Sequence, residues 1–118
     1  MESFTDLDVW QKGMQLVKEA YVLTRKLPPE EQYGLTAQIR RAVVSILANL
    51  AEGFSRATAA DKAHKYTTSR GECSEVKALL LVCEELGLLQ QKETSRAKNL
   101  SDETGRLLSG LIQKFAHS

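Results

Sequence analysis

The sequence predicts an all-α fold, an antiparallel, up-and-down, left-handed four-helix bundle that occupies residues 1–118 as one domain. Four long segments carry apolar residues at steps of three and four, as one face of an α-helix requires. Only two prolines and seven glycines interrupt the chain. No strand-length run alternates apolar with polar residues, so a β-sheet is not expected. The connections between the segments are short, which places consecutive helices antiparallel.

The first helix is expected over about residues 6–27. Thr5 is the predicted N-cap, with Asp8 three residues on as its capping-box partner. Pro28 and Pro29 end this helix, because a residue that precedes a proline is disfavoured in the helical region. The stripe predicted to face the core comprises Leu7, Trp10, Met14, Val17 and Tyr21.

The second helix is expected over about residues 35–53 and the third over about residues 59–86. Gly53 is predicted to end the second helix in the left-handed conformation that glycine favours. Thr58 is the predicted N-cap of the third helix, and Gly87 is its predicted stop. The buried face predicted for the second helix comprises Leu35, Ile39, Ala42, Val43, Ile46 and Leu50.

The last helix is expected over about residues 94–115.

The third helix is apolar on more than one side near its end, which predicts that it buries more than one side. One side serves the bundle, and the other is a candidate interface between subunits. The apolar residues concerned are Val76, Leu79, Leu80, Leu81, Val82, Cys83 and Leu86.

Charge is nearly balanced over the chain, with 16 basic and 15 acidic residues, but it is unevenly distributed. Residues 40–70 hold six basic residues against two acidic ones. This excess is typical either of a surface that faces a polyanion or of ordinary solvated helix faces that form salt bridges. The residues predicted to contact nucleic-acid phosphates are Arg40, Arg41, Arg56, Lys62 and Lys65.

Asn49 and Glu52 stand one helical turn apart near the end of an apolar helix. One interpretation is a polar pocket. The favoured one is a structural hydrogen-bond network in which Glu52 pairs with an arginine such as Arg41 or Arg70.

Enzymatic chemistry is not expected, and neither is a cofactor or a metal. Asp61-x-x-His64 is only a weak echo of the Glu-x-x-His pairs of a di-iron bundle, and His117 lies near the chain end. Cys73 and Cys83 lie too far apart on one helix to form a disulfide, so both are expected to be reduced packing residues.

The first ten residues carry acids and lack the apolar stretch of a signal peptide. No run approaches the ~18 apolar residues that a membrane-spanning helix needs. A cytoplasmic protein with no membrane association is therefore expected.

The chain resembles the four-helix-bundle proteins encoded in intervening sequences of bacterial 23S rRNA genes. The matching motifs are Phe4-x-Asp6-Leu7-x-Val9-Trp10-Gln11-Lys12, Gly34-Leu35-x-x-Gln38-Ile39-Arg40-Arg41-Ala42, Ser45-Ile46-x-x-Asn49-x-Ala51-Glu52-Gly53, Gly71-x-x-Ser74-Glu75 and Leu86-Gly87. The chain departs from the family at Leu47, where proline is frequent, and in the usual Gly-Ser-x-x-Glu-Leu, which is here Gly71-Glu72-Cys73-Ser74-Glu75-Val76.

This resemblance implies a homopentameric, barrel-like assembly. It also implies kinship with accessory proteins of diversity-generating retroelements, which bind nucleic acid and a reverse transcriptase and are more basic than this chain. We therefore expect a non-enzymatic, oligomeric accessory protein that binds RNA or DNA through backbone phosphates. The alternative is a scaffold that binds a protein partner without touching nucleic acid.

Overall fold

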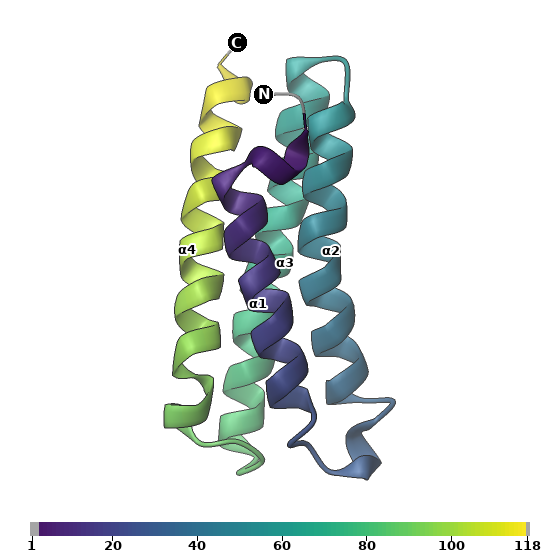
Figure 1. Cartoon of the computed structure of the whole chain (residues 1–118), viewed down its shortest axis with the longest axis vertical. Coiled ribbons are helices and arrows are strands. Elements are labelled where there is room, and N and C mark those ends of the chain that lie inside the picture. Colours follow the sequence, from purple (N-terminus) through teal and green to yellow (C-terminus); the bar gives the residue numbers. More distant parts are fainter. Residues whose placement is uncertain (1–2, 118) are drawn as a thin grey trace.

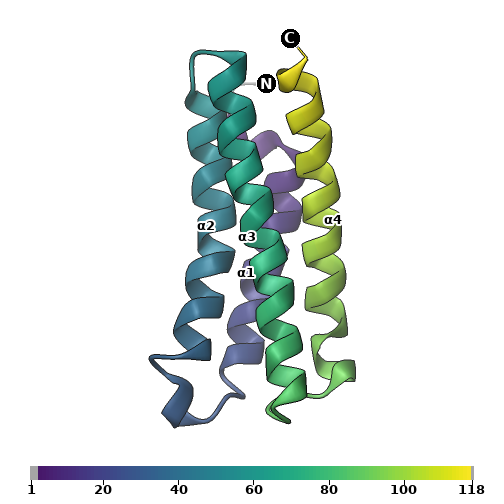
Figure 2. The ribbon, with the colours of Figure 1, turned by 180° about the vertical axis from the view of Figure 1, so that it is seen from behind.

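The computed structural model describes residues 3–117 and confirms the predicted four-helix bundle (Figure 1). Each helix packs against its neighbours in the chain, and the last helix returns to the first and closes the bundle (Figure 2). The molecule measures 45 × 23 × 20 Å, and its first and last described residues lie at the same end. The helices are α1 (Asp8–Thr24), α2 (Leu35–Ser55), α3 (Ala59–Glu85) and α4 (Gln91–Ala116).

Helix α1 turns a different face to the core from the predicted one. Its buried residues are Val9, Gly13, Leu16, Ala20, Leu23 and Thr24. The predicted stripe, Leu7 to Tyr21, is only partly buried and packs against the edge of the core. Both stripes recur at the steps of three and four that a helix bundle requires, so the spacing alone does not show which stripe is buried. Gly13 distinguishes them, because a Cβ there would lie 2.7 Å from Cδ2 of Leu47, and glycine lets α1 lie this close to α2.

The start of α1 also differs from the prediction. Ser3, rather than Thr5, is the capping residue, and its hydroxyl accepts a hydrogen bond from the Thr5 N–H at 3.1 Å. This cap opens a short 3-10 turn, Phe4–Asp6, and the extended residue Leu7 separates that turn from α1. The predicted box of Thr5 and Asp8 was therefore wrong.

Helix α1 ends at Thr24, earlier than the predicted residue 27. Pro28 and Pro29 have no N–H to donate to the carbonyls of Thr24 and Arg25, so the helical ladder stops there. The Leu27 N–H takes the Thr24 carbonyl instead, at 3.1 Å, in a tighter turn.

Gly53 does not end α2, which continues to Ser55. A Cβ on Gly53 would lie 2.7 Å from the Tyr66 ring, so this glycine serves the contact with α3 rather than a left-handed cap. Gly87 does adopt the predicted left-handed conformation, with φ 73°. The Leu88 N–H then bonds the Cys83 carbonyl at 2.9 Å, as in a Schellman motif.

Thr58 caps α3 as predicted, since its side chain accepts a hydrogen bond from the Asp61 N–H. Helix α4 begins at Gln91, three residues before the predicted start. Gln90 and Glu93 form a capping box there, and the Glu93 carboxylate accepts the Gln90 N–H at 2.9 Å. The sequence does not predict this box, because glutamine is not among the preferred capping residues.

Two buried hydroxyls tie the helices together. Ser69 of α3 donates to the Ile46 carbonyl of α2 at 2.7 Å, and Ser101 of α4 donates to the Cys73 carbonyl of α3 at the same distance. No charged side chain is buried among the residues that the structure describes. Within residues 3–117, no helix is both long and apolar enough to cross a membrane.

Candidate nucleic-acid interface

Arg40 is held in place on the side of α2 that faces α1. Its Nε donates a hydrogen bond to the Thr24 hydroxyl at 2.9 Å, and its guanidinium carbon lies 4.5 Å from the centre of the Tyr21 ring. Its two terminal nitrogens make no hydrogen bond or ion pair within residues 3–117. A stacked guanidinium with free terminal donors matches the geometry that arginine uses to bind a phosphate.

Arg41 points away from Arg40, because consecutive residues are about 100° apart around a helix. It reaches α3, where its guanidinium pairs with Glu72 at 3.4 Å and with Glu75. Its charge is therefore offset by two carboxylates, so Arg41 fits the interpretation of the basic excess as a helix face that forms salt bridges.

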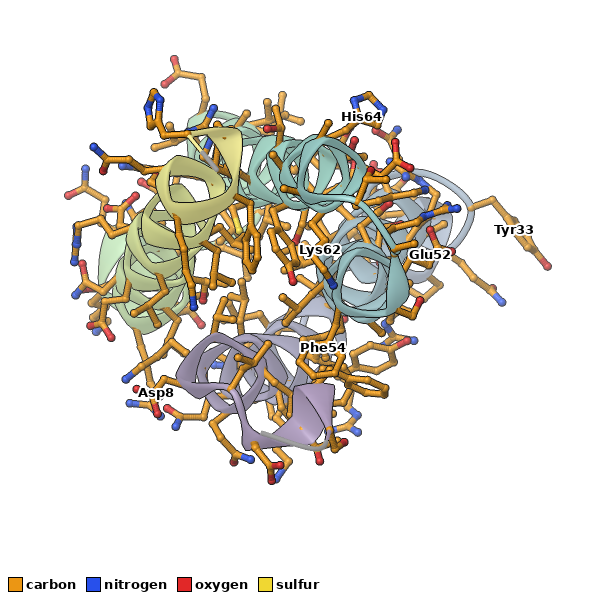
Figure 3. All side chains as sticks on the ribbon, turned by 90° about the horizontal axis from the view of Figure 1, so that it is seen from above. Asp8, Tyr33, Glu52, Phe54, Lys62 and His64 are labelled. Carbon is orange, nitrogen blue, oxygen red and sulfur yellow. The ribbon has the colours of Figure 1, made fainter. Side chains whose placement is uncertain are left out.

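Lys62, Phe54 and Glu52 lie at the end of the bundle where α2 meets α3 (Figure 3), and the predicted residues Lys62 and Lys65 both have partners within the fold. Lys65 pairs with Glu52 at 2.7 Å, and this hydrogen bond lowers the pKa of the Glu52 carboxyl. Lys62 donates to the Phe54 carbonyl at 2.6 Å and to the Gly53 carbonyl at 3.4 Å, and so covers the end of α2. Both lysines thus act within the fold.

Arg56 lies just after α2 in the connection to α3 and is exposed. Its side chain makes no ion pair within the described residues, although its charge contributes to the lowered pKa of Glu52. Arg40 and Arg56 stand 16 residues apart, about 24 Å along an α-helix. The five predicted residues therefore do not form one continuous basic patch.

The residues predicted to form a polar network each bind a different partner. The Asn49 amide donates to the Ser45 carbonyl of its own helix at 2.9 Å. Glu52 pairs with Lys65 rather than with an arginine, and Arg70 donates to the Ser109 hydroxyl at 3.3 Å. Asn49 is half-buried, and Glu52 and Arg70 are exposed. No hydrogen bond or ion pair connects these three residues to one another, so the predicted network is not formed.

Two further basic residues, which were not predicted, lie next to Tyr21, the residue whose ring Arg40 covers. Lys18 and Arg25 line one shallow depression on α1 together with Tyr21 and Val22. No acidic residue lines this depression, and neither Lys18 nor Arg25 forms an ion pair within the described residues. We call Lys18, Tyr21, Val22, Arg25 and Arg40 the Tyr21 surface. The spacing of Lys18, Tyr21 and Arg25 at steps of three and four could have grouped them on one face of the first helix, and only the packing of α1 on α2 adds Arg40.

Neither cysteine has the properties of a nucleophile. Burial raises the pKa of the Cys73 thiol to about 12 and also raises the pKa of the Cys83 thiol. Both thiols are therefore protonated at neutral pH, and the thiolate is the reactive form. Residues 3–117 also contain no group of three or more His, Cys, Asp or Glu side chains arranged to hold a metal ion.

The fold and its surface define a class of small helical proteins in which the charged groups lie on the helix faces and the interior is apolar or neutral. Residues 5–110 match the model of the 23S rRNA-intervening sequence protein family, and the chain belongs to that family. The family that the sequence motifs indicated is thereby confirmed.

A solved structure has the same fold. It is the crystal structure, at 1.70 Å resolution, of a protein of unknown function from the S23 ribosomal protein family of Bacteroides thetaiotaomicron VPI-5482. The TM-score is 0.81 at 24% sequence identity, and the match covers 88% of this chain and 97% of that chain. No curated protein matches the chain.

Proposed function

We propose that the protein is a non-enzymatic, oligomeric accessory protein of the cytoplasm that binds RNA or DNA through backbone phosphates. The observation that carries this proposal is the Tyr21 surface. There Arg40 is stacked on Tyr21 with free terminal nitrogens, and Lys18 and Arg25 lie beside the same ring. The name of the family refers to 23S rRNA, which makes structured RNA the first nucleic acid to test.

The contact involves phosphates rather than bases. Arg40 covers one face of the Tyr21 ring, so a guanidinium occupies the position where a base would stack on that face. The Nε of Arg40 is bonded to Thr24, but its terminal nitrogens, the Arg25 guanidinium and the Lys18 ammonium offer donors that suit phosphate oxygens. Binding is therefore expected to be insensitive to sequence and sensitive to salt.

Assembly multiplies this surface. The resemblance to the family supports a homopentamer, and exposed apolar side chains on α3 offer an interface. Leu81, Val82 and Leu86 are 46%, 42% and 61% exposed, which is unusual for large apolar residues close together on one helix end. A ring of copies repeats the Tyr21 surface, so a long polyanion that binds one copy weakly binds the ring much more tightly.

The same apolar residues support the second candidate function, a scaffold that binds a protein partner through Leu81, Val82 and Leu86. The kinship with accessory proteins of retroelements makes a reverse transcriptase the first such partner to test. A scaffold of this kind would bind its partner tightly and with little dependence on salt.

Fluorescence anisotropy with a structured RNA and a DNA duplex tests the first function. We expect Arg40→Ala to weaken binding by roughly tenfold, since a charge-assisted contact is worth about 1.5–3 kcal/mol. Arg96→Ala is the matched control, because it also removes one arginine but from an exposed site on α4 with only a long 3.7 Å ion pair.

Arg40→Lys separates charge from shape. The lysine keeps the charge but loses the planar fork that stacks on Tyr21, so intermediate binding is expected. If Arg40→Ala and Arg96→Ala bind equally well, the Tyr21 surface is not the contact. If the unaltered protein binds neither RNA nor DNA, the scaffold becomes the leading function.

A further inference from the structure

A groove runs between α3 and α4. Its volume is about 260 Å³. The side chains along its two edges come from both helices, and they are Arg70, Ser74, Lys77, Asp102, Arg106 and Ser109. None of these residues belongs to the Tyr21 surface, which lies on α1 and α2.

Small residues keep the floor of this groove open. Gly105 has no side chain, and a Cβ placed there would be 4.0 Å from Cβ of Cys73, an ordinary contact. The Ser101 hydroxyl turns inward and donates to the Cys73 carbonyl at 2.7 Å. The Ser101 hydroxyl and the Cys73 carbonyl on the floor therefore bond each other, and no side chain from the floor fills the space above it.

The edges carry an excess of positive charge and of hydrogen-bond donors. Lys77 is paired with Asp102 at 3.0 Å, which leaves two arginines without a carboxylate partner. Arg70 makes one bond, to the Ser109 hydroxyl at 3.3 Å, and Arg106 makes no hydrogen bond or ion pair within residues 3–117. Arginine forks of this kind bind tetrahedral oxyanions.

The floor adds no negative charge that would repel an anion. Cys73 is the one titratable group on it, and burial keeps the thiol protonated. The volume is also below the range of about 300–1,000 Å³ typical of sites for drug-sized ligands, so the groove suits a single small group.

We propose that the α3–α4 groove binds a phosphate group between the guanidinium groups of Arg70 and Arg106, with the hydroxyls of Ser74 and Ser109 as further donors. This inference rests on the proposed function in naming the source, a phosphate of the nucleic-acid backbone. Inorganic phosphate presents the same chemistry to the same donors. The groove thus provides a second contact on the opposite side of the bundle from the Tyr21 surface.

The direct test is a titration of the protein with inorganic phosphate, followed by amide chemical shifts in NMR spectra. We expect saturable shifts at Ser74, Gly105 and Ser109. Ser74→Asp places a negative charge on the edge of the groove and is expected to weaken phosphate binding roughly tenfold or more. Ser74→Asn is the matched comparison, because asparagine has the shape of aspartate without its charge. It replaces one donor of the groove, and we expect it to weaken phosphate binding less than Ser74→Asp does.

The second arm uses structured RNA and anisotropy over a range of salt concentrations. Arg70→Ala with Arg106→Ala is expected to reduce the slope of log K against log salt by about one, the contribution of one phosphate contact. The control removes two charges from another side of α4, with Lys92→Ala and Arg96→Ala, and is expected to leave the slope unchanged.

The two arms separate this inference from the proposed function. Phosphate-induced shifts in the groove without any RNA binding would support the groove as a site for free phosphate and contradict the proposed function. RNA binding with an unchanged slope in Arg70→Ala/Arg106→Ala, together with no phosphate-induced shifts in the groove, would overturn the inference and leave the proposed function standing.

Discussion

Gly53 and Gly71 are both helical glycines, yet their surroundings differ completely. A Cβ on Gly53 would lie 2.7 Å from the ring of buried Tyr66, whereas a Cβ on Gly71 would meet nothing within 4 Å. Gly53 is thus required where α2 crosses α3, and Gly71 only weakens its helix. Both glycines belong to the motifs that indicated the family, but only the packing separates their roles.

We therefore expect opposite effects of the same substitution at these two positions. Gly53→Ala should lower the free energy of unfolding by about 1–3 kcal/mol, because the extra methyl forces Tyr66 to move. Gly71→Ala should raise it by about 0.5–1 kcal/mol, because alanine has the better helix propensity. Urea unfolding monitored by circular dichroism measures both, and equal effects would show that the contact with Tyr66 tolerates a methyl group.

The start of α4 shows how a helix end is fixed by charge. Glu93 accepts the Gln90 N–H and also pairs with Lys26 of the α1–α2 connection at 3.2 Å. The hydrogen bond from Gln90 is the main reason why the pKa of Glu93 is lowered, and the bond from Lys26 adds to it. Glu84, near the end of α3, has its pKa lowered by hydrogen bonds from Lys98 and Thr94.

These lowered pKa values predict how stability depends on pH. A carboxyl group whose pKa is lower in the folded state contributes stability above its unfolded pKa of about 4.3, and loses it as the pH falls through the folded pKa. Stability should therefore fall below about pH 4.5, and Glu93→Gln should make that fall smaller while keeping an acceptor at the cap.

Urea midpoints measured between pH 7 and pH 3 test this dependence. Glu30→Gln is the control, because the exposed Glu30 side chain makes no hydrogen bond or ion pair within the described residues. An identical pH profile for Glu93→Gln and the unaltered protein would mean that the α4 cap does not carry the effect.

Sequence patterns predicted the number and order of the helices, because periodicity and the signals at Thr58 and Gly87 are local. They failed where tertiary contacts decide. The buried face of α1 depends on Gly13 meeting Leu47, and Gly53 stays helical because it meets Tyr66. Neither contact can be predicted from the local sequence, because each joins two different helices.

The candidate site was predicted less completely, for the same reason. Arg40 was identified from one helix, but its partners Tyr21 and Thr24 lie on another. Arg41 looked equivalent in the sequence, and only the fold shows that Glu72 and Glu75 offset it.

At the scale of the whole molecule, the bundle covers its own core but leaves the end of α3 uncovered. Leu81, Val82 and Leu86 remain exposed beside a well-packed interior. Burial of such residues between copies would stabilise an assembly by roughly 25 cal/mol per Å² of apolar surface. The proposed oligomer therefore has a specific interface to test.

We expect Leu81→Glu with Val82→Glu to lower the mass of the assembly in light scattering while the helical content is retained. Tyr33→Glu is the control, because Tyr33 is 90% exposed and belongs to the α1–α2 connection rather than to α3. A mass that does not change in the double variant would place the interface elsewhere.

The most direct test of phosphate binding is the affinity of the unaltered protein for structured RNA as salt is increased. Each phosphate that the protein neutralises contributes roughly −0.7 to −0.9 to the slope of log K against log salt. Contacts from Arg40, Arg25 and Lys18 of a single copy therefore predict a slope of about −2 or steeper, and an assembly predicts a steeper one still. Tight binding with a slope near zero, or no binding at low salt, would contradict the account.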